Sequence, residues 1–263
     1  MVRRWRFEVS GWAARVLVCV AAVVVASCSS SSTTTNTSTG PTTAATTTFQ
    51  GTVAGSGGQS GTITLTVQSQ VALSPRHLRL PFVATLHAQA SVAASGSVHI
   101  AGGSTTTLAG TFDPSTKAFN VSGGGFAFTG VLGGTVVSGT YTGPSGVTGG
   151  FSSLSTTTGT VTAYCGNVFS SGAGQVATGV FNLAVSQATG AVSGTFSITA
   201  DTPPTVGSIT GRLTGTAITF TFTGTAGQSA GQSGTGTGTI QGGTVSGRSD
   251  SNNPFSGSTS ACQ

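Results

Sequence analysis

The chain has 263 residues, of which only 5% are charged, whereas about a quarter are charged in typical soluble domains. It contains 48 Thr, 36 Ser and 42 Gly but a single Glu and a single Lys, which argues against helices with solvent-exposed faces and favours strands. Of the formal net charge of +5, four arginines and one glutamate within residues 1–15 contribute +3. The rest of the chain is nearly neutral, which excludes the clustered positive face that nucleic-acid binding requires.

The first 27 residues have the pattern of a signal peptide. A basic segment is followed by eleven apolar residues at 16–26, the length of a signal-peptide core and too short for a membrane-spanning helix. The segment ends in Val25-Ala26-Ser27-Cys28, which resembles the bacterial lipobox. The resemblance implies cleavage before Cys28, diacylglycerol on its sulfur and a further acyl chain (palmitate or similar) on its amine. An ordinary signal peptide with an incidental Cys28 is the alternative.

A lipidated Cys28 predicts where the protein resides. Two or more acyl chains anchor a protein stably, so the expected partner is a membrane, contacted through the lipid. Ser29 follows the cysteine, in place of the Asp that retains some lipoproteins in the inner membrane. The resemblance therefore implies the cell envelope, at the outer membrane, facing the periplasm or the surface.

Residues 28–48 predict a flexible tether. They are rich in Ser and Thr, carry no charge and contain no aliphatic residue larger than Ala after Cys28, so they cannot bury enough apolar surface to offset the entropy of ordering.

From Phe49 onward, apolar residues recur at every second position, as in 62–67 and 218–223. This period places one face of a strand in a core and the other in water. Turn signals separate the strands at roughly ten-residue spacing. The sequence therefore predicts an all-β fold, an antiparallel meander that closes into a barrel or packs as a sandwich. Residues 81–94 begin with proline and are rich in Ala, so a short helix competes there with the favoured strand.

Two segments of the chain align with later ones. Residues 133–153 resemble 242–260, and 61–67 resemble 179–185. The offset of about 110 to 120 residues predicts two related units, 49–158 and 159–263, each with about eight strands. One larger continuous sheet is the alternative.

The cysteines fit an exported protein. Cys19 lies in the signal peptide and Cys28 at the lipidation site, which leaves Cys165 and Cys262 to form a disulfide in an oxidising compartment. We expect this bond to join the first strand of the second unit to its last.

No set of residues points to catalysis. The spacing of His77, His87 and His99 matches no zinc-ligand pattern, and the mature chain has only Asp113, Asp201 and Asp250 as acids, all in turn-like contexts. We therefore assign no catalytic, cofactor-binding or metal-binding residue and expect no cofactor and no enzymatic activity.

The aromatic residues after the signal peptide are almost all phenylalanines, and both tryptophans lie within the signal peptide. Carbohydrate-binding platforms and the interfacial belts of membrane barrels use Trp and Tyr. We expect the alternating phenylalanines to pack a core: Phe126, Phe128, Phe181, Phe196, Phe220 and Phe222.

Short repeats such as Val192-Ser193-Gly194-Thr195 and Val245-Ser246-Gly247 resemble those of uncharacterised bacterial lipoproteins with Gly-rich strands. They are similar, more distantly, to the small barrels of surface lipoproteins such as transferrin-binding proteins. The resemblance implies a soluble barrel at the cell surface, with no binding residue carried over.

The functional expectation is a lipid-anchored, exported, non-enzymatic structural or binding module with an unknown envelope or extracellular partner. One alternative is a lipocalin-like barrel that carries a small hydrophobic ligand, which requires a cavity with a mouth. A second alternative is an envelope hydrolase.

Overall fold

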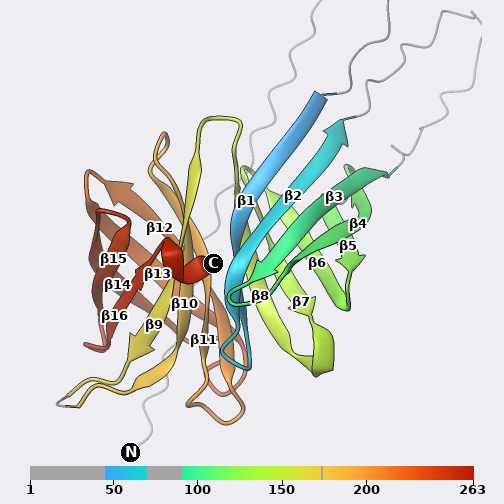
Figure 1. Ribbon diagram of the computed structural model, residues 1–263. Coiled ribbons are helices and arrows are strands. Elements are labelled where there is room, and N and C mark those ends of the chain that lie inside the picture. Colours follow the sequence, from blue (N-terminus) through green and yellow to red (C-terminus); the bar gives the residue numbers. More distant parts are fainter. Residues whose placement is uncertain (1–44, 70–90, 173) are drawn as a thin grey trace, which may run out of the picture. The chain divides into compact units, whose positions relative to one another are not determined.

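The computed structural model describes residues 45–69, 91–172 and 174–263, and these form two closed β-barrels that follow each other in the chain (Figure 1). Both barrels belong to one compact unit. The first consists of β1 (Ala45–Gly55), β2 (Ser60–Ser69), β3 (Val92–Ile100), β4 (Thr105–Asp113), β5 (Ala118–Gly123), β6 (Phe126–Gly133), β7 (Val136–Thr142) and β8 (Thr148–Ser155). The second consists of β9 (Val161–Phe169), β10 (Ala177–Ser186), β11 (Ala191–Ile198), β12 (Thr205–Thr214), β13 (Ala217–Ala226), β14 (Ser233–Gln241), β15 (Thr244–Ser249) and β16 (Pro254–Ser258).

Each barrel is an antiparallel meander in which every strand pairs with the next along the chain. Pairing of β1 with β8 closes the first barrel, and pairing of β9 with β16 closes the second. Two short 3-10 helices complete the described elements, η1 (Pro144–Gly146) and η2 (Ser260–Cys262). The all-β prediction is confirmed, and the sheets close as barrels rather than packing as a sandwich or forming one continuous sheet.

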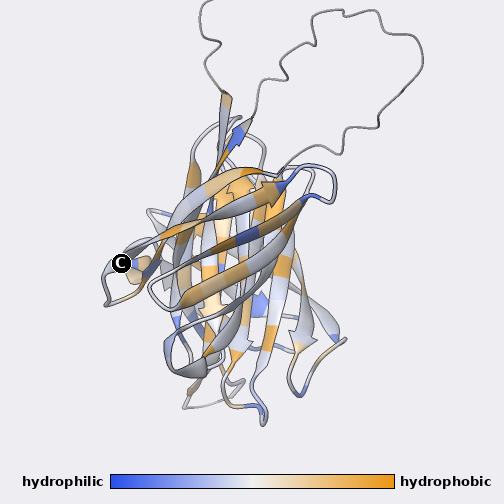
Figure 2. Cartoon of the chain, turned by 90° about the vertical axis from the view of Figure 1, so that its right-hand side faces the viewer, coloured by the Kyte–Doolittle hydropathy of each residue, from blue (hydrophilic) through white to orange (hydrophobic). Residues whose placement is uncertain are grey.

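The alternation of apolar and polar residues is what shapes both barrels. Along β13, Ile218, Phe220 and Phe222 contribute to the core of the second barrel, while the threonines between them are more exposed. Hydrophobic and more polar residues alternate along the strands that face the viewer in Figure 2. Each barrel has its own cluster of buried apolar side chains, which lie on the inward faces of its strands.

The predicted tether extends too far along the chain. Residues 45–48 are the beginning of β1 and pair with residues 66–69 of β2. Threonine favours strands, and the backbone hydrogen bonds to β2 order a segment that has few apolar side chains of its own.

The internal duplication coincides with equivalent strands. The aligned segments 61–67 and 179–185 lie in the second strand of each barrel, β2 and β10. The aligned segments 133–153 and 242–260 contain the last two strands of each barrel, β7–β8 and β15–β16. The prediction of two eight-stranded units is confirmed.

Four strands are buried on both faces because the barrels contact each other there. Outward positions of β1, β8, β10 and β11 carry small polar or small apolar side chains that are fully buried, among them Thr52, Ala54, Ser152, Ala184, Ser193 and Ser197. Asn182 of β10 donates from Nδ2 to the carbonyl oxygen of Val53 at 2.5 Å and accepts from the hydroxyl of Ser60. The hydroxyls of Ser152 and Ser193 bond to each other across the same contact. Small side chains let the two sheets approach closely, and these hydrogen bonds satisfy polar groups that would otherwise be costly to bury.

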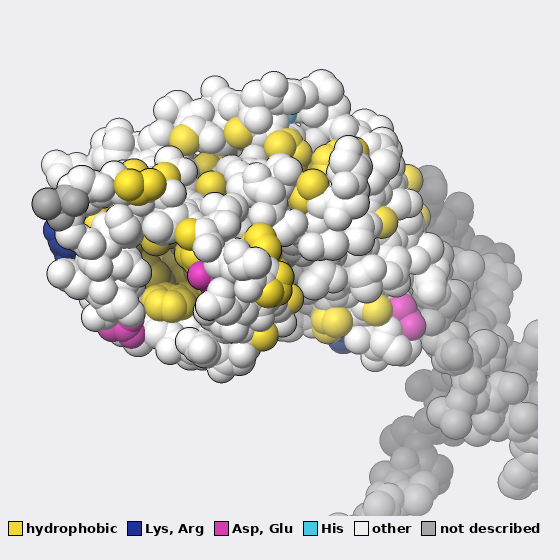
Figure 3. All heavy atoms as spheres, turned by 90° about the horizontal axis from the view of Figure 1, so that it is seen from below, with side chains coloured by type: hydrophobic (Ala, Val, Ile, Leu, Met, Phe, Trp, Pro, Cys, Tyr) yellow, Lys and Arg dark blue, Asp and Glu magenta, His cyan; other side chains and the backbone are white. Residues whose placement is uncertain are grey.

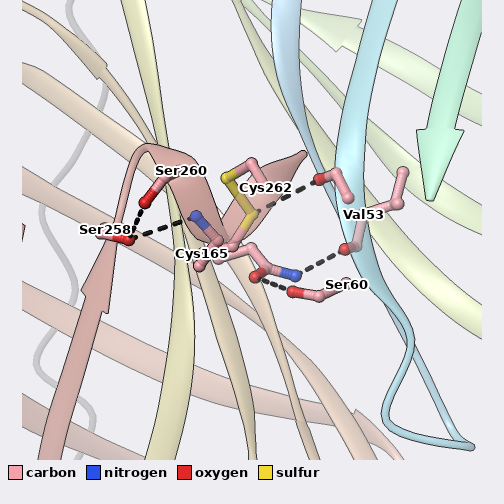
Figure 4. The surroundings of a disulfide bond; sticks show 9 residues. Val53, Ser60, Cys165, Ser258, Ser260 and Cys262 are labelled. Carbon is pink, nitrogen blue, oxygen red and sulfur yellow. Dashed lines mark hydrogen bonds between the residues drawn. A yellow bond between two sulfur atoms is a disulfide. The ribbon is translucent and has the colours of Figure 1, made fainter. Parts of the chain in front are cut away.

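Cys165 and Cys262 form a disulfide (Figure 4). Cys165 lies on β9, and Cys262 lies in η2, directly after β16, rather than within the last strand itself. Both cysteines are buried, and the Cys165 sulfur lies 3.9 Å from the carbonyl oxygen of Gly61 in the first barrel. The bond therefore fastens the C-terminal segment at the seam where β9 meets β16.

Several sequence predictions fall outside the described residues. These are the signal peptide, Cys28 and residues 29–44, and also residues 81–90 of the segment with ambiguous structure. The remaining part of that segment, 92–94, lies in β3. No helix within the described ranges is both long and apolar enough to span a membrane.

We predict that replacing both disulfide cysteines, Cys165→Ala with Cys262→Ala, lowers the free energy of unfolding by about 2–5 kcal/mol, because the bond closes a long loop in the unfolded chain. Their sequence separation is 97 residues. Urea unfolding followed by circular dichroism measures the effect. The wild-type chain unfolded in the presence of a reductant should match the double variant, and an unchanged unfolding midpoint would contradict the prediction.

Candidate functional site

One end of the second barrel contains a cavity of about 250 Å³. In the view from below, the surface is hollowed, hydrophobic atoms line the hollow, and an acidic side chain lies beside it (Figure 3). The loops at this end contain residues 170–172 with 174–176, 199–204, 227–232 and 250–253, whereas the turns at the opposite end are 187–190, 215–216 and 242–243. The longer loops thus gather around the mouth of the cavity.

The wall of the cavity is apolar and largely aromatic. The phenylalanine rings contact one another at angles typical of edge-to-face pairs. Ring centroids are 5.0 Å apart for Phe181 and Phe255, and 5.4 Å apart for Phe220 and Phe255. The apolar lining residues all lie within strands: Val168, Phe181, Phe196, Ile198, Ile209, Phe220, Phe222 and Phe255.

The polar lining residues lie on loops or at the ends of strands. They are Thr205, Ser229, Gln232, Ser233, Ser249, Asp250, Ser251 and Asn253. The cavity is therefore apolar along the strands and polar at its mouth, the distribution expected of a site for a ligand with an apolar body.

Glycines on β14 leave the room for this cavity. In the sequence Ser233-Gly234-Thr235-Gly236-Thr237-Gly238, the threonines are exposed and the glycines are less so. Gly234 pairs with Phe222 and Gly236 pairs with Phe220 on β13. A Cβ at Gly236 would lie 2.4 Å from Cζ of Phe220, and one at Gly234 would lie 2.4 Å from Cζ of Phe222. Each ring therefore lies over a glycine, where any larger residue would displace it.

The equivalent strand of the first barrel is filled instead. Counted from the turn that follows each strand, Phe126 and Phe128 of β6 occupy the places of Gly234 and Gly236. Phe128 stacks on Tyr141, with ring centroids 5.2 Å apart, and contacts Phe151 edge to face at 5.4 Å. An eight-stranded barrel is just wide enough to be filled by side chains or to hold one small ligand. The interiors of the two barrels therefore differ at these two positions, which are phenylalanines in the first barrel and glycines in the second.

Two carboxylates lie at the mouth. Asp250 accepts hydrogen bonds from the amide of Thr235 at 2.7 Å and from its hydroxyl at 3.3 Å. The backbone amide of Thr235 is the main cause of the lowered pKa of Asp250, since a hydrogen bond to the charged form favours ionisation. Asp201 accepts from the hydroxyl of Thr205 at 2.5 Å and from that of Ser229 at 3.4 Å.

Hydrogen bonds join two of the mouth loops. The side-chain oxygen of Gln228 accepts from the amide of Thr202 at 3.0 Å, and the amide of Gln228 donates to the carbonyl oxygen of Pro203 at 3.1 Å. Asp201 adds the bonds to Thr205 and Ser229 described above. Loops 199–204 and 227–232 therefore hold each other in place on one side of the mouth.

The predicted core phenylalanines are all located in the barrel interiors, but with two roles. Phe126 and Phe128 pack the first barrel, whereas Phe181, Phe196, Phe220 and Phe222 pack the second and also line its cavity. Sequence reasoning missed the cavity. Its signal was the run of alternating Gly and Thr at 234–239, which indicates inward positions without side chains.

The other candidate residues do not form a site in the described part of the chain. His99 of β3 is partly exposed and lies 3.3 Å from the Thr105 hydroxyl, while His77 and His87 lie outside the described residues. Asp113 is partly exposed, and hydrogen bonds from the side chain and backbone of Ser115 lower its pKa to about 2, as in an ordinary turn. Within the described ranges, no three His, Cys, Asp or Glu residues group together as a metal site would require.

Comparison with protein-family models and with curated proteins finds no match to this chain. The pairing of the strands defines the fold as two tandem eight-stranded antiparallel barrels.

We predict that Gly236→Ala lowers the free energy of unfolding by about 1–3 kcal/mol and reduces the volume of the cavity, because the new methyl group forces the Phe220 ring aside. Urea unfolding measures the first effect and a crystal structure of the variant the second. The control is Gly133→Ala on β6, where an added Cβ meets no atom within 4 Å; this change should leave stability within about 0.5 kcal/mol. Equal effects of the two substitutions would contradict the assignment.

Proposed function

We propose that this protein is an exported, lipid-anchored component of the cell envelope whose second barrel binds a small apolar ligand. The first barrel serves as its packed structural partner. The observation that carries the proposal is the aromatic cavity with its mouth at one end of the second barrel. It favours the ligand-carrying alternative over a purely structural role.

The size of the cavity restricts the ligand. An engineered apolar cavity of roughly 150 Å³ binds benzene, and sites for drug-sized molecules range from roughly 300 to 1,000 Å³. A volume of about 250 Å³ lies between these. The proposed ligand is therefore a compact molecule of one to three rings, or a short alkyl chain, rather than a long-chain lipid.

The proposed role is binding without catalysis. Among the described residues that line the cavity there is no histidine, cysteine or lysine, and Asp250 at the mouth is the one carboxylate among them. Its serines lie at the mouth, separated from the aromatic interior.

The anchoring proposal rests on the sequence of residues 25–28 and on the polarity of the barrel exterior. The exposed positions of β13 and β14 include Thr219, Thr221, Thr235, Thr237 and Thr239, whereas a membrane-embedded barrel presents an apolar band outward. This polarity supports a barrel held outside the bilayer, with attachment through lipid on Cys28. The destination that we propose is the outer membrane.

We predict that the purified chain binds the neutral fluorescent probe N-phenyl-1-naphthylamine and that Ile198→Trp reduces the affinity at least about tenfold. Ile198 is the last residue of β11 and lines the cavity, so an indole there occupies volume that the probe needs. Fluorescence titration measures the dissociation constant.

The matched control for this test is Thr221→Trp, which adds the same indole to an exposed position of β13. It should leave probe affinity unchanged. Loss of binding in the control as well, or retention of full affinity in Ile198→Trp, would refute the assignment of the ligand to this cavity.

We predict that Cys28→Ala abolishes incorporation of radiolabelled palmitate and either releases the protein from the membrane fraction or blocks its processing, since the alanine side chain offers no sulfur for the lipid. Fractionation and labelling of cells that express each form measure the outcome. Cys19→Ala, within the predicted signal segment, is the control and should be lipidated normally. Normal membrane retention of Cys28→Ala would count against the anchor.

A further inference from the structure

Within the proposed ligand-binding function, we propose a chemical class for the ligand: an amphipathic amine, with its apolar body among the phenylalanine rings and its cationic group at the mouth, beside Asp250 and Asp201. The inference rests on the charges at the mouth and on the chemistry of the wall.

Asp250 is the charged residue that lines the cavity. It lies in loop 250–253, and its Oδ2 is held by Thr235, while the Ser251 hydroxyl donates to Oδ1 at 3.3 Å. These bonds orient the carboxylate and keep it ionised at neutral pH. A carboxylate accepts about four hydrogen bonds, so capacity remains for the N–H groups of an ammonium ion.

Asp201 supplies a second negative charge at the same end. It lies in loop 199–204, and the two residues that donate to its side chain, Thr205 and Ser229, both line the cavity. In the strand order of this barrel, loops 199–204 and 250–253 are separated by loop 227–232 on one side and by loop 170–176 on the other. The two carboxylates therefore lie on opposite loops of the mouth, and their fields add over the opening.

The positive charges of the second barrel do not line the cavity. Arg212 pairs with Thr219 near the opposite end of β12, close to the turn at Gly190. Arg248 is exposed and donates from Nη1 to the backbone and side-chain oxygens of Asn252, both at 3.2 Å. A cationic ligand group at the mouth is thus attracted by two carboxylates, and no arginine or lysine is among the described residues that line the cavity.

The wall favours the same class of ligand. A cation within about 6 Å of a phenyl ring is attracted by the negative face of the ring, and Phe222 and Phe196 lie near the mouth, where their centroids are 5.8 Å apart. An anionic group in this place would be repelled by the carboxylates and by the negative faces of the same rings. The polarity of the mouth therefore selects against carboxylates and for amines.

The test compares three ligands that share one body: 4-phenylbutylamine, 4-phenylbutan-1-ol and 4-phenylbutanoate. Each displaces N-phenyl-1-naphthylamine from the purified chain at neutral pH, where the amine is protonated. The amine should bind about fivefold more tightly than the alcohol, the difference expected of an ion pair exposed to solvent, and the carboxylate should bind most weakly. Added salt should narrow the difference between the amine and the alcohol.

Asp250→Asn should reduce the preference for the amine over the alcohol, and Asp250→Asn combined with Asp201→Asn should abolish it. The matched control is Asp113→Asn, which changes a partly exposed turn carboxylate in the first barrel and should leave the affinities for the amine and the alcohol unchanged. If the alcohol or the carboxylate binds as tightly as the amine, or if Asp250→Asn keeps the preference, the amine inference is wrong while the proposed function stands. If neither the probe nor any of the three ligands binds, the proposed function itself fails.

Discussion

The interiors of both barrels depend on the placement of an aromatic ring over an inward-facing glycine of the neighbouring strand. An eight-stranded barrel is too narrow to hold large side chains at every inward position, so large and small residues must alternate around it. Tyr141 pairs with Gly149 in the first barrel, where a Cβ would lie 2.5 Å from Cε1 of the Tyr141 ring, and Phe220 and Phe222 pair with Gly236 and Gly234 in the second. Glycine weakens a strand when considered alone, but here the ring covers the exposed backbone and fills the space that a side chain would take. This pairing helps to explain how a chain with 42 glycines forms the sixteen strands of its described part.

The same constraint produces the difference between the two barrels. In β6, aromatic residues occupy the inward positions near one end, and they stack with Tyr141 to fill it. In β14 the corresponding positions are glycines, and the rings of β13 cover them without filling the centre. A duplicated architecture thus combines one barrel with an end filled by aromatic side chains and another with a cavity at the corresponding end. The contact between the barrels is made of small buried side chains on β1, β8, β10 and β11, so the first barrel covers part of the outer face of the second.

The disulfide and the mouth of the cavity lie on different parts of the second barrel, so the bond that stabilises the barrel is not part of the proposed binding site. Cys165 and Cys262 join the seam of the barrel beside the first barrel, whereas the proposed ligand site is formed by the opposite ends of the strands and four loops. The loops are held by side-chain and backbone hydrogen bonds of Gln228 and Asp201. A rigid scaffold with function at its loop end is the usual arrangement in small β-barrels.

The amino-acid sequence by itself determined the class of fold, the division into two eight-stranded units and the pairing of Cys165 with Cys262, because each depends on local periodicity, internal repetition or the count of cysteines. It also placed the phenylalanines of both interiors correctly, since period two assigns residues to faces. It failed at 45–48, where pairing with β2 orders a polar segment. Only the tertiary structure decided that the sheets close, that β1, β8, β10 and β11 are buried on both faces, and that Phe220 lies over Gly236 beside a cavity. These features depend on which strands become neighbours and on how much volume the facing residues leave, and neither quantity is contained in any single segment of the chain.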